Sequence, residues 1–254
     1  MKKIISILTV TIPVFILLFC TGSIKEKEDK KQVSSLNKNV AVLELFTSQG
    51  CSSCPAADRL LGSYSSKEGV IALSFHVDYW NHLGWKDPFS SAAFSQRQHT
   101  YANEFASSGV YTPQLIVNGQ KEMVGSDKDK IAEAVKYFQN GPSSSKIIID
   151  GIKTDNNKLS LTFSLQCAFK NSAINIALIQ NKVTTPVKAG ENGGVTLAND
   201  NVVRNFKTIN QFNAKKNIAD IDLVDGIDKK EFSVVVYLQD VTSKKIYAAI
   251  KSSL

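Results

Sequence analysis

Two cysteines separated by two residues are the feature of this sequence that could carry chemistry most directly. Cys51 and Cys54 follow a short apolar run and precede Pro55. A CxxC pair at the start of a helix is typical of a dithiol redox site, because the helix start favours a thiolate. Cys51 is then expected to be the attacking thiol, and Cys54 the thiol that resolves the mixed disulfide. A static disulfide and half of a metal site are the alternatives.

The segments around the pair predict a strand, a helix and a second strand. Residues 40–46 are nearly all apolar and have strand length, a pattern typical of a strand that is covered on both faces. Apolar residues recur at helical spacing after Pro55, and residues 70–75 form another apolar run. Further along, Asn118-Gly119 predicts a hairpin, and residues 126–138 predict a capped amphipathic helix.

The second half of the chain has a different pattern, which begins after Gly141. Residues 159–169 alternate strictly between apolar and polar types, and residues 174–178 and 232–238 repeat the alternation. A period of two predicts half-exposed antiparallel strands. Cys167 lies on the apolar face of its expected strand, where we expect an inert core thiol.

Several side chains are expected beside the dithiol, because parallel strands bring their carboxyl ends to one edge of a sheet. His76, Asp78, Trp80 and Trp85 follow the second expected strand. His76 could favour the Cys51 thiolate or rest on a backbone carbonyl. Asp78 could hold His76 or cap the turn, and the two tryptophans could form an apolar wall for a substrate segment or the loop's own small core.

Two further ideas concern a buried acid and a metal. Glu44 lies inside the first expected strand, where it could accept the proton of Cys54 or form a salt bridge. His76, Asp78 and His82 together with the thiols could suit copper or zinc. We nevertheless expect no bound metal and no cofactor.

The first residues have the pattern of an export signal. Lys2 and Lys3 precede an apolar run that ends at Cys20, followed by small residues. Lipid attachment at Cys20, ordinary cleavage nearby and an uncleaved anchor are the three possible outcomes, and all place the body in the periplasm or cell envelope. The net charge of +7 is spread over scattered lysines, which argues against a nucleic-acid partner.

Four stretches of the sequence carry a resemblance to known families. They are VLELFTSQGCSSCPAADRLL, FHVDYWNHLGWKDPF, VYTPQLIVNG and GENGGVTLANDNVVRNF. Together they resemble the secreted thioredoxin-like family catalogued as domain of unknown function 1223. The resemblance implies a thioredoxin-like fold, with a cis proline at Pro113 that faces the dithiol. It also implies that Thr112 and Pro113 receive the extended chain of a substrate beside the reactive sulfur.

The expected fold class is therefore a thioredoxin-like α/β domain followed by an all-β, sandwich-like domain. We expect a leader over residues 1–22, a flexible tether over 23–39, the α/β domain over 40–141 and the β domain over 146–254. A structure with mainly helices in the last of these segments would contradict this prediction.

The expected function is that of an exported thiol-disulfide oxidoreductase. Its partners would be thiols or disulfides of envelope proteins, with no nucleic acid, and it would meet a membrane through its leader or a lipid anchor. A protein of a different class is the alternative, namely an envelope-tethered binding protein, because a fold does not imply its commonest activity. A copper-handling protein is the third possibility.

Overall fold

The structure is a computed structural model that describes residues 39–105, 109–141, 145–155, 157–166, 171–226 and 228–254. The expected leader, with Cys20, lies outside the described residues, as do Cys167 and all but the last residue of the expected tether. In the described part of the chain, no helix is both long enough and apolar enough to cross a membrane.

The first half of the chain folds into four strands and three helices. They are β1 (Ala41–Thr47), α1 (Cys54–Gly62), β2 (Val70–His76), α2 (Ala92–Glu104), β3 (Gln114–Val117), β4 (Lys121–Val124) and α3 (Lys128–Gln139), with a short 3-10 turn, η1 (Asn81–Leu83). The predicted strands, the hairpin and the helices are confirmed here. Helix α3 is capped by Asp127, whose side chain accepts from the Lys130 N–H, so the helix predicted over residues 126–138 is present with a cap.

The second half contributes seven strands. They are β5 (Lys146–Asp155), β6 (Lys158–Gln166), β7 (Ser172–Pro186), β8 (Thr196–Ile209), β9 (Asn217–Asp222), β10 (Phe232–Asp240) and β11 (Ile246–Ser253), with a 3-10 turn, η2 (Lys229–Glu231), before β10. Strand β6 alternates between buried and partly exposed residues as the period of two predicts.

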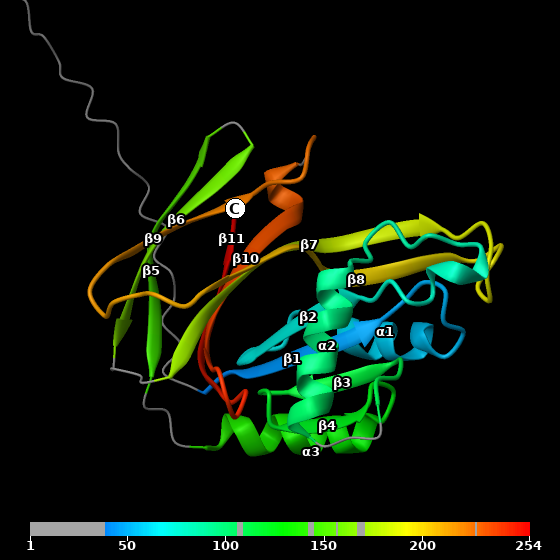
Figure 1. Cartoon of the computed structure of the whole chain (residues 1–254), viewed down its shortest axis with the longest axis horizontal. Helices are drawn as coiled ribbons and strands as arrows, with labels where there is room; N and C mark the ends of the chain where they lie inside the picture. Colours follow the sequence, from blue (N-terminus) through cyan, green and yellow to red (C-terminus); the bar gives the residue numbers. More distant parts are fainter. Residues whose placement is uncertain (1–38, 106–108, 142–144, 156, 167–170, 227) are drawn as a thin grey trace, which may run out of the picture. The chain divides into compact units, whose positions relative to one another are not determined.

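One mixed sheet joins strands from both halves of the chain (Figure 1). Its eight strands lie in the order β11-β10-β7-β8-β2-β1-β3-β4, and a separate three-stranded sheet has the order β5-β6-β9. Strands β1 and β2 are parallel, and β8 lies parallel to the other edge of β2, where Val202 is opposite Ser74. The edge of β2 that the first half leaves open is therefore paired by a strand from the second half.

The expected fold class is corrected by this topology. Of the residues that the structure describes, 46% lie in strands and 20% in helices, so the fold is mostly β and is not a thioredoxin-like α/β domain followed by a separate sandwich. Local periodicity identified the strands, but it carried no information on which distant strand would pair with β2. The domain limits at residues 141 and 146 stay a prediction.

The core lies on both faces of the large sheet. Helices α1 and α3 pack on one face of β1 to β4, and α2 packs on the opposite face. The three-stranded sheet packs against β7, β10 and β11. Residues 174–178 of β7 and 232–238 of β10, both expected to be half-exposed, are consequently buried on both sides.

Candidate functional site

The two cysteines lie at the junction between β1 and α1. Cys54 is the first residue of the helix, and its N–H donates to the Cys51 carbonyl at 3.2 Å. The exposed fraction of the side chains is small, 1% for Cys51 and 0% for Cys54. Both are free thiols, so the static disulfide named as an alternative is not formed. The thioredoxin-like character expected for this site is corrected together with the fold.

The surroundings of the two sulfurs shift their acidities in opposite directions. Cys51 Sγ lies 3.3 Å from Ser53 Oγ and 3.8 Å from the Thr112 carbonyl oxygen. A hydrogen bond from Cys54 lowers the pKa of Cys51 to about 6, against the upward effect of burial. Burial raises the pKa of Cys54 far above its usual range, and the neighbouring Cys51 and Asp58 add to this rise. The pair thus offers one thiolate and one thiol at neutral pH.

The segment before β3 lies beside the dithiol. The Thr112–Pro113 peptide bond is cis, as the resemblance implied, and Pro113 is buried. Trp80 donates from Nε1 to Thr112 Oγ1 at 2.8 Å, so the long loop after β2 holds this segment in place. Thr112, Pro113 and Trp80 are therefore brought together with Cys51. Their expected roles toward a substrate stay a prediction.

A buried acid accompanies Cys54 on the same helix. Asp58 follows Cys54 by four residues, so both side chains lie on one face of α1. Its exposed fraction is 5%, and Asp58 Oδ1 has no hydrogen-bond partner among the described residues. Burial raises the pKa of Asp58 to about 7, while the nearby His76 limits the rise. Sequence reasoning missed this residue, although its helical spacing from Cys54 could have revealed it.

His76 is fully buried and is paired with an aspartate. Its Nδ1 lies 2.7 Å from Asp87 Oδ2, and its Nε2 has no partner in the described part of the chain. Burial opposes the charged imidazolium, but Asp87 raises the pKa of His76 above its usual value. Asp87 also accepts the Gln49 N–H at 2.9 Å. His76 thus fixes the loop before Cys51 through Asp87, and its ring nitrogen bonds to Asp87 and not to the Cys51 sulfur.

Trp85 also supports the loop before the dithiol. Its Nε1 donates to Gln49 Oε1 at 3.1 Å, and both tryptophans of the chain are partly buried. The indole N–H groups of Trp80 and Trp85 therefore donate to the segments on either side of the thiols in the sequence, to Thr112 and to Gln49.

The side chains suggested as metal ligands are held apart. Asp78 accepts from Ser95 Oγ at 2.5 Å, which ties the end of β2 to α2. His82 is exposed, and its Nδ1 lies 2.7 Å from the Tyr79 carbonyl oxygen of its own loop. Over the described ranges, no three His, Cys, Asp or Glu side chains gather in a way that could hold a metal ion.

The connection between β7 and β8 lies against the CxxC motif, and we call residues 187–195 the cover loop. The Glu191 carboxylate accepts the Ser52 N–H at 2.8 Å. Asn192 donates from Nδ2 to the carbonyl oxygens of Gln49 and Cys51, both at 2.9 Å. Figure 1 shows the β7–β8 hairpin reaching the end of the sheet where β1 leads into α1. The Gly-Glu-Asn-Gly-Gly stretch of this loop is part of the family resemblance, but its sequence does not predict the contact with the CxxC motif.

Glu44 belongs to a different network. Arg97 donates to Glu44 Oε1 through Nε at 3.0 Å and Nη2 at 2.7 Å, and Tyr237 donates to the same oxygen at 2.8 Å. Tyr101 donates to Oε2. Of the two roles weighed for Glu44, the ion pair is the one present, and it joins α2 to strands of both halves.

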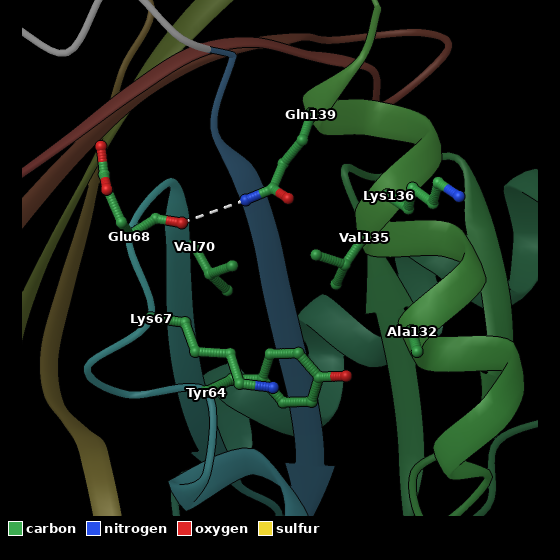
Figure 2. Close-up of a pocket in the computed structure, with 8 residues that line it drawn as sticks. All are labelled: Tyr64, Lys67, Glu68, Val70, Ala132, Val135, Lys136 and Gln139. Atoms are coloured by element: carbon green, nitrogen blue, oxygen red, sulfur yellow. Dashed lines mark hydrogen bonds between the residues drawn. The ribbon is translucent and has the colours of Figure 1, made fainter.

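A shallow groove of about 250 Å³ lies at the opposite end of β1 and β2 (Figure 2). Val70, which lines it, pairs with the first residue of β1, whereas the dithiol follows the last. The ammonium group of Lys67 stands 3.8 Å from the centre of the Tyr64 ring, and Gln139 donates to the Glu68 carbonyl. These contacts fasten the turn before β2 to α3, so the groove is separate from the thiols.

The fold and the site define a β-rich protein with a buried, reduced dithiol at the start of a helix. The chain belongs to the family described as protein of unknown function DUF1223, which matches residues 42–239. No curated protein matches the chain.

Solved structures include a similar protein. The crystal structure of a protein from Agrobacterium tumefaciens is 28% identical, with a TM-score of 0.66 over 85% of this chain and 95% of that chain. A domain of the outer membrane lipoprotein Omp28 from Porphyromonas gingivalis is 16% identical, with a TM-score of 0.28 over 45% of this chain and 90% of that chain. A DUF3823 family protein from Bacteroides ovatus is 17% identical, with a TM-score of 0.29 over 44% and 56%. The last two likenesses are too weak to support any conclusion.

Proposed function

We propose that this protein is an exported thiol-disulfide oxidoreductase that acts on cysteines of envelope proteins through Cys51 and Cys54. The observation that supports it most is the opposite shift of the two thiols. The pKa of Cys51 is lowered to about 6, and burial raises the pKa of Cys54. Thiol-disulfide exchange needs one thiolate and one thiol. The thiolate is the nucleophile, and the resolving thiol stays protonated until the mixed disulfide has formed.

The reaction would run through a mixed disulfide. The Cys51 thiolate attacks one sulfur of a substrate disulfide, a new S–S bond forms, and the other substrate sulfur leaves as a thiolate. Cys54 then loses its proton and attacks the Cys51 sulfur, which releases the second substrate thiolate and leaves a Cys51–Cys54 disulfide. Two electrons pass from the protein to the substrate, and the reverse sequence oxidises a client. The direction depends on the reduction potential.

Asp58 is the group we propose as acceptor of the Cys54 proton. It lies one helical turn from Cys54, its Oδ1 has no partner in the described part of the chain, and burial raises its pKa to about 7. An acid with a pKa near neutrality can take up a proton and return it at the same pH. Glu44, which the sequence suggested for this role, is engaged by Arg97 instead.

Export is proposed on the pattern of the first residues. Lys2 and Lys3 followed by an apolar run form a signal that directs the chain to the envelope, with lipid attachment at Cys20 as one outcome. Thiols and disulfides of envelope proteins are then the substrates within reach.

A tethered binding protein is the second candidate. The observation in its favour is the 1% exposed fraction of Cys51, because a substrate disulfide needs access to the sulfur. A Cys51→Ser/Cys54→Ser protein that retained full biological activity would favour binding over exchange.

The test is equilibration of the reduced protein with glutathione buffers, followed by acid quenching and peptide mass spectrometry. The mapping separates the Cys51–Cys54 peptide from Cys20 and Cys167. We expect one two-electron transition confined to this peptide. Cys54→Ala should trap mixed disulfides with client proteins through Cys51, and Cys51→Ala should trap none. Equal alkylation of both thiols at neutral pH, without a Cys51–Cys54 disulfide in any buffer, would refute the proposal.

A further inference from the structure

The cover loop has a shape that its own sequence fixes. The Val187 N–H donates to the Val195 carbonyl at 2.9 Å, and the Gly194 N–H donates to the Val187 carbonyl at 2.9 Å. Gly190 and Gly194 have φ angles of +77° and +86°, in the left-handed region that favours glycine. The loop is therefore a defined turn and not a slack connection between β7 and β8.

Three hydrogen bonds join this turn to residues 49–52, which include the first half of the CxxC motif. One runs from the Ser52 N–H to the Glu191 carboxylate, and two run from Asn192 Nδ2 to the carbonyls on either side of Gly50. Asn192 is 8% exposed, whereas Glu191 is exposed. The contact thus combines a buried amide with a carboxylate at the surface.

The other segments beside Cys51, namely the Thr112–Pro113 segment and helix α1, are held more firmly than the cover loop. Thr112 precedes the buried Pro113 and is held by Trp80, and Cys54 belongs to α1. The cover loop touches residues 49–52 through polar contacts at a hairpin tip, and water can hydrogen-bond to the same groups once the tip moves away. Its tip, Glu191 and Asn192, lies beyond the last strand pair, Pro186 with Thr196, so the tip can move while the paired strands stay in place.

We propose that the cover loop selects which molecules reach Cys51, by admitting small reagents and excluding protein segments until its hydrogen bonds to residues 49–52 break. The inference rests on the proposed exchange function and adds a specificity element to it. Glu191 and Asn192 act here as positioning residues, because neither contacts the Cys51 sulfur.

Alkylation of the reduced protein with two probes tests the selection by size. Iodoacetamide is the small probe, and a maleimide carrying a polyethylene glycol chain is the bulky probe, with labelling of Cys51 followed by peptide mass spectrometry. Asn192→Ala removes two hydrogen bonds, and we expect the rate with the bulky probe to rise about tenfold. The rate with iodoacetamide should change less. Lys188→Ala, an exposed change in the same loop, is the matched control and should leave both rates unchanged.

Two further variants distinguish movement of the cover loop from a general loss of stability of the fold. Glu191→Gln retains an oxygen that can accept the Ser52 N–H and should keep the selectivity, while Glu191→Ala should lose part of it. Thermal unfolding of each variant shows whether the fold is retained. Equal ratios of the two rates in wild type, Asn192→Ala and Lys188→Ala, with all three folded, would overturn the proposal.

The failure of this inference can be told from the failure of the proposed function. If the rates do not depend on the cover loop but Cys51 and Cys54 still equilibrate with glutathione, exchange stands and the selection is wrong. If opening the loop raises the labelling of Cys51 but no Cys51–Cys54 disulfide forms in any glutathione buffer, the cover is real and exchange is wrong.

Discussion

Replacement of Asp58 by asparagine should make the protein more stable at neutral pH, and the gain should disappear in acid. Asp58 is buried, and its Oδ1 has no partner among the residues described. A buried carboxylate without full compensation destabilises the folded state, whereas a neutral carboxylic acid or a carboxamide does so much less. The asparagine side chain has nearly the same shape as that of aspartate but cannot ionise, so the comparison isolates the charge.

The size and sign of the effect follow from the pKa. Burial raises the pKa of Asp58 from its ordinary 3.8 to about 7. Below pH 3.8 the Asp58 carboxyl is neutral in both the folded and the unfolded protein, so its ionisation does not change the free energy of unfolding. As the pH rises toward 7, only the unfolded chain ionises, and the folded protein loses up to about 4 kcal/mol of relative stability. The difference between Asp58→Asn and wild type should therefore grow over this window and level off above it.

The assay is urea unfolding of the reduced proteins at a series of pH values from about 4 to about 8. Wild type and Asp58→Asn are compared at each pH, so that titrations shared by both proteins cancel. Asp129→Asn, an exposed change on α3, is the control and should alter stability by less than about 1 kcal/mol throughout. A constant difference between Asp58→Asn and wild type from acid to neutral pH would refute the reasoning.

Three other changes test separate parts of the structure. Arg97→Ala leaves the Glu44 carboxylate buried without its cation and should lower the free energy of unfolding by about 3–5 kcal/mol in urea; a loss below about 1 kcal/mol would contradict the ion pair. Gly119→Ala should lower stability by more than about 1 kcal/mol in the same assay, because Gly119 has a φ of +66° and a Cβ there would lie 1.8 Å from the Lys244 carbonyl oxygen; an unchanged midpoint would argue against this contact. Alkylation of Cys51 by iodoacetamide should reach half its maximal rate near pH 6, since its pKa is about 6, and a midpoint near the ~8.5 of a free cysteine would contradict that environment.

The local elements of this fold could be predicted because their signals are local. The apolar runs that became β1 and β2, the Asn118-Gly119 turn and the period of two in β6 each depend on residues close together in the sequence. The position of the CxxC pair at the start of α1 follows from the same information. For these segments, burial and backbone preference agree with the final structure.

The pairing of strands could not be predicted in the same way. Strand β8 lies beside β2 although Val202 and Ser74 are far apart in the sequence, and periodicity does not encode a partner. Residues 174–178 look half-exposed by pattern, but the three-stranded sheet covers one face and the rest of the core covers the other. The fold class was wrong for this reason, even though most of the strands were located.

In the candidate site, too, the residues close together in the sequence could be predicted, and those brought in from a distant strand pair could not. Cys51 and Cys54 could be found from their spacing, and Asp58 could have been found from its place one turn later on the helix. Glu191 and Asn192 could not, because they reach the motif only through the hairpin that extends the sheet from β2.

The pairing of β8 with β2 therefore does more than close an open sheet edge. It carries the cover loop to the CxxC motif, and Asn199, at the start of the same strand, lies with its Oδ1 3.4 Å from Gln49 Nε2. The loop before Cys51 is thus held by Asp87 and Trp85 and also by the β7–β8 hairpin. If the cover loop controls access as proposed, a change that loosens the tip of this hairpin should alter the reactivity of Cys51 while the sheet stays folded.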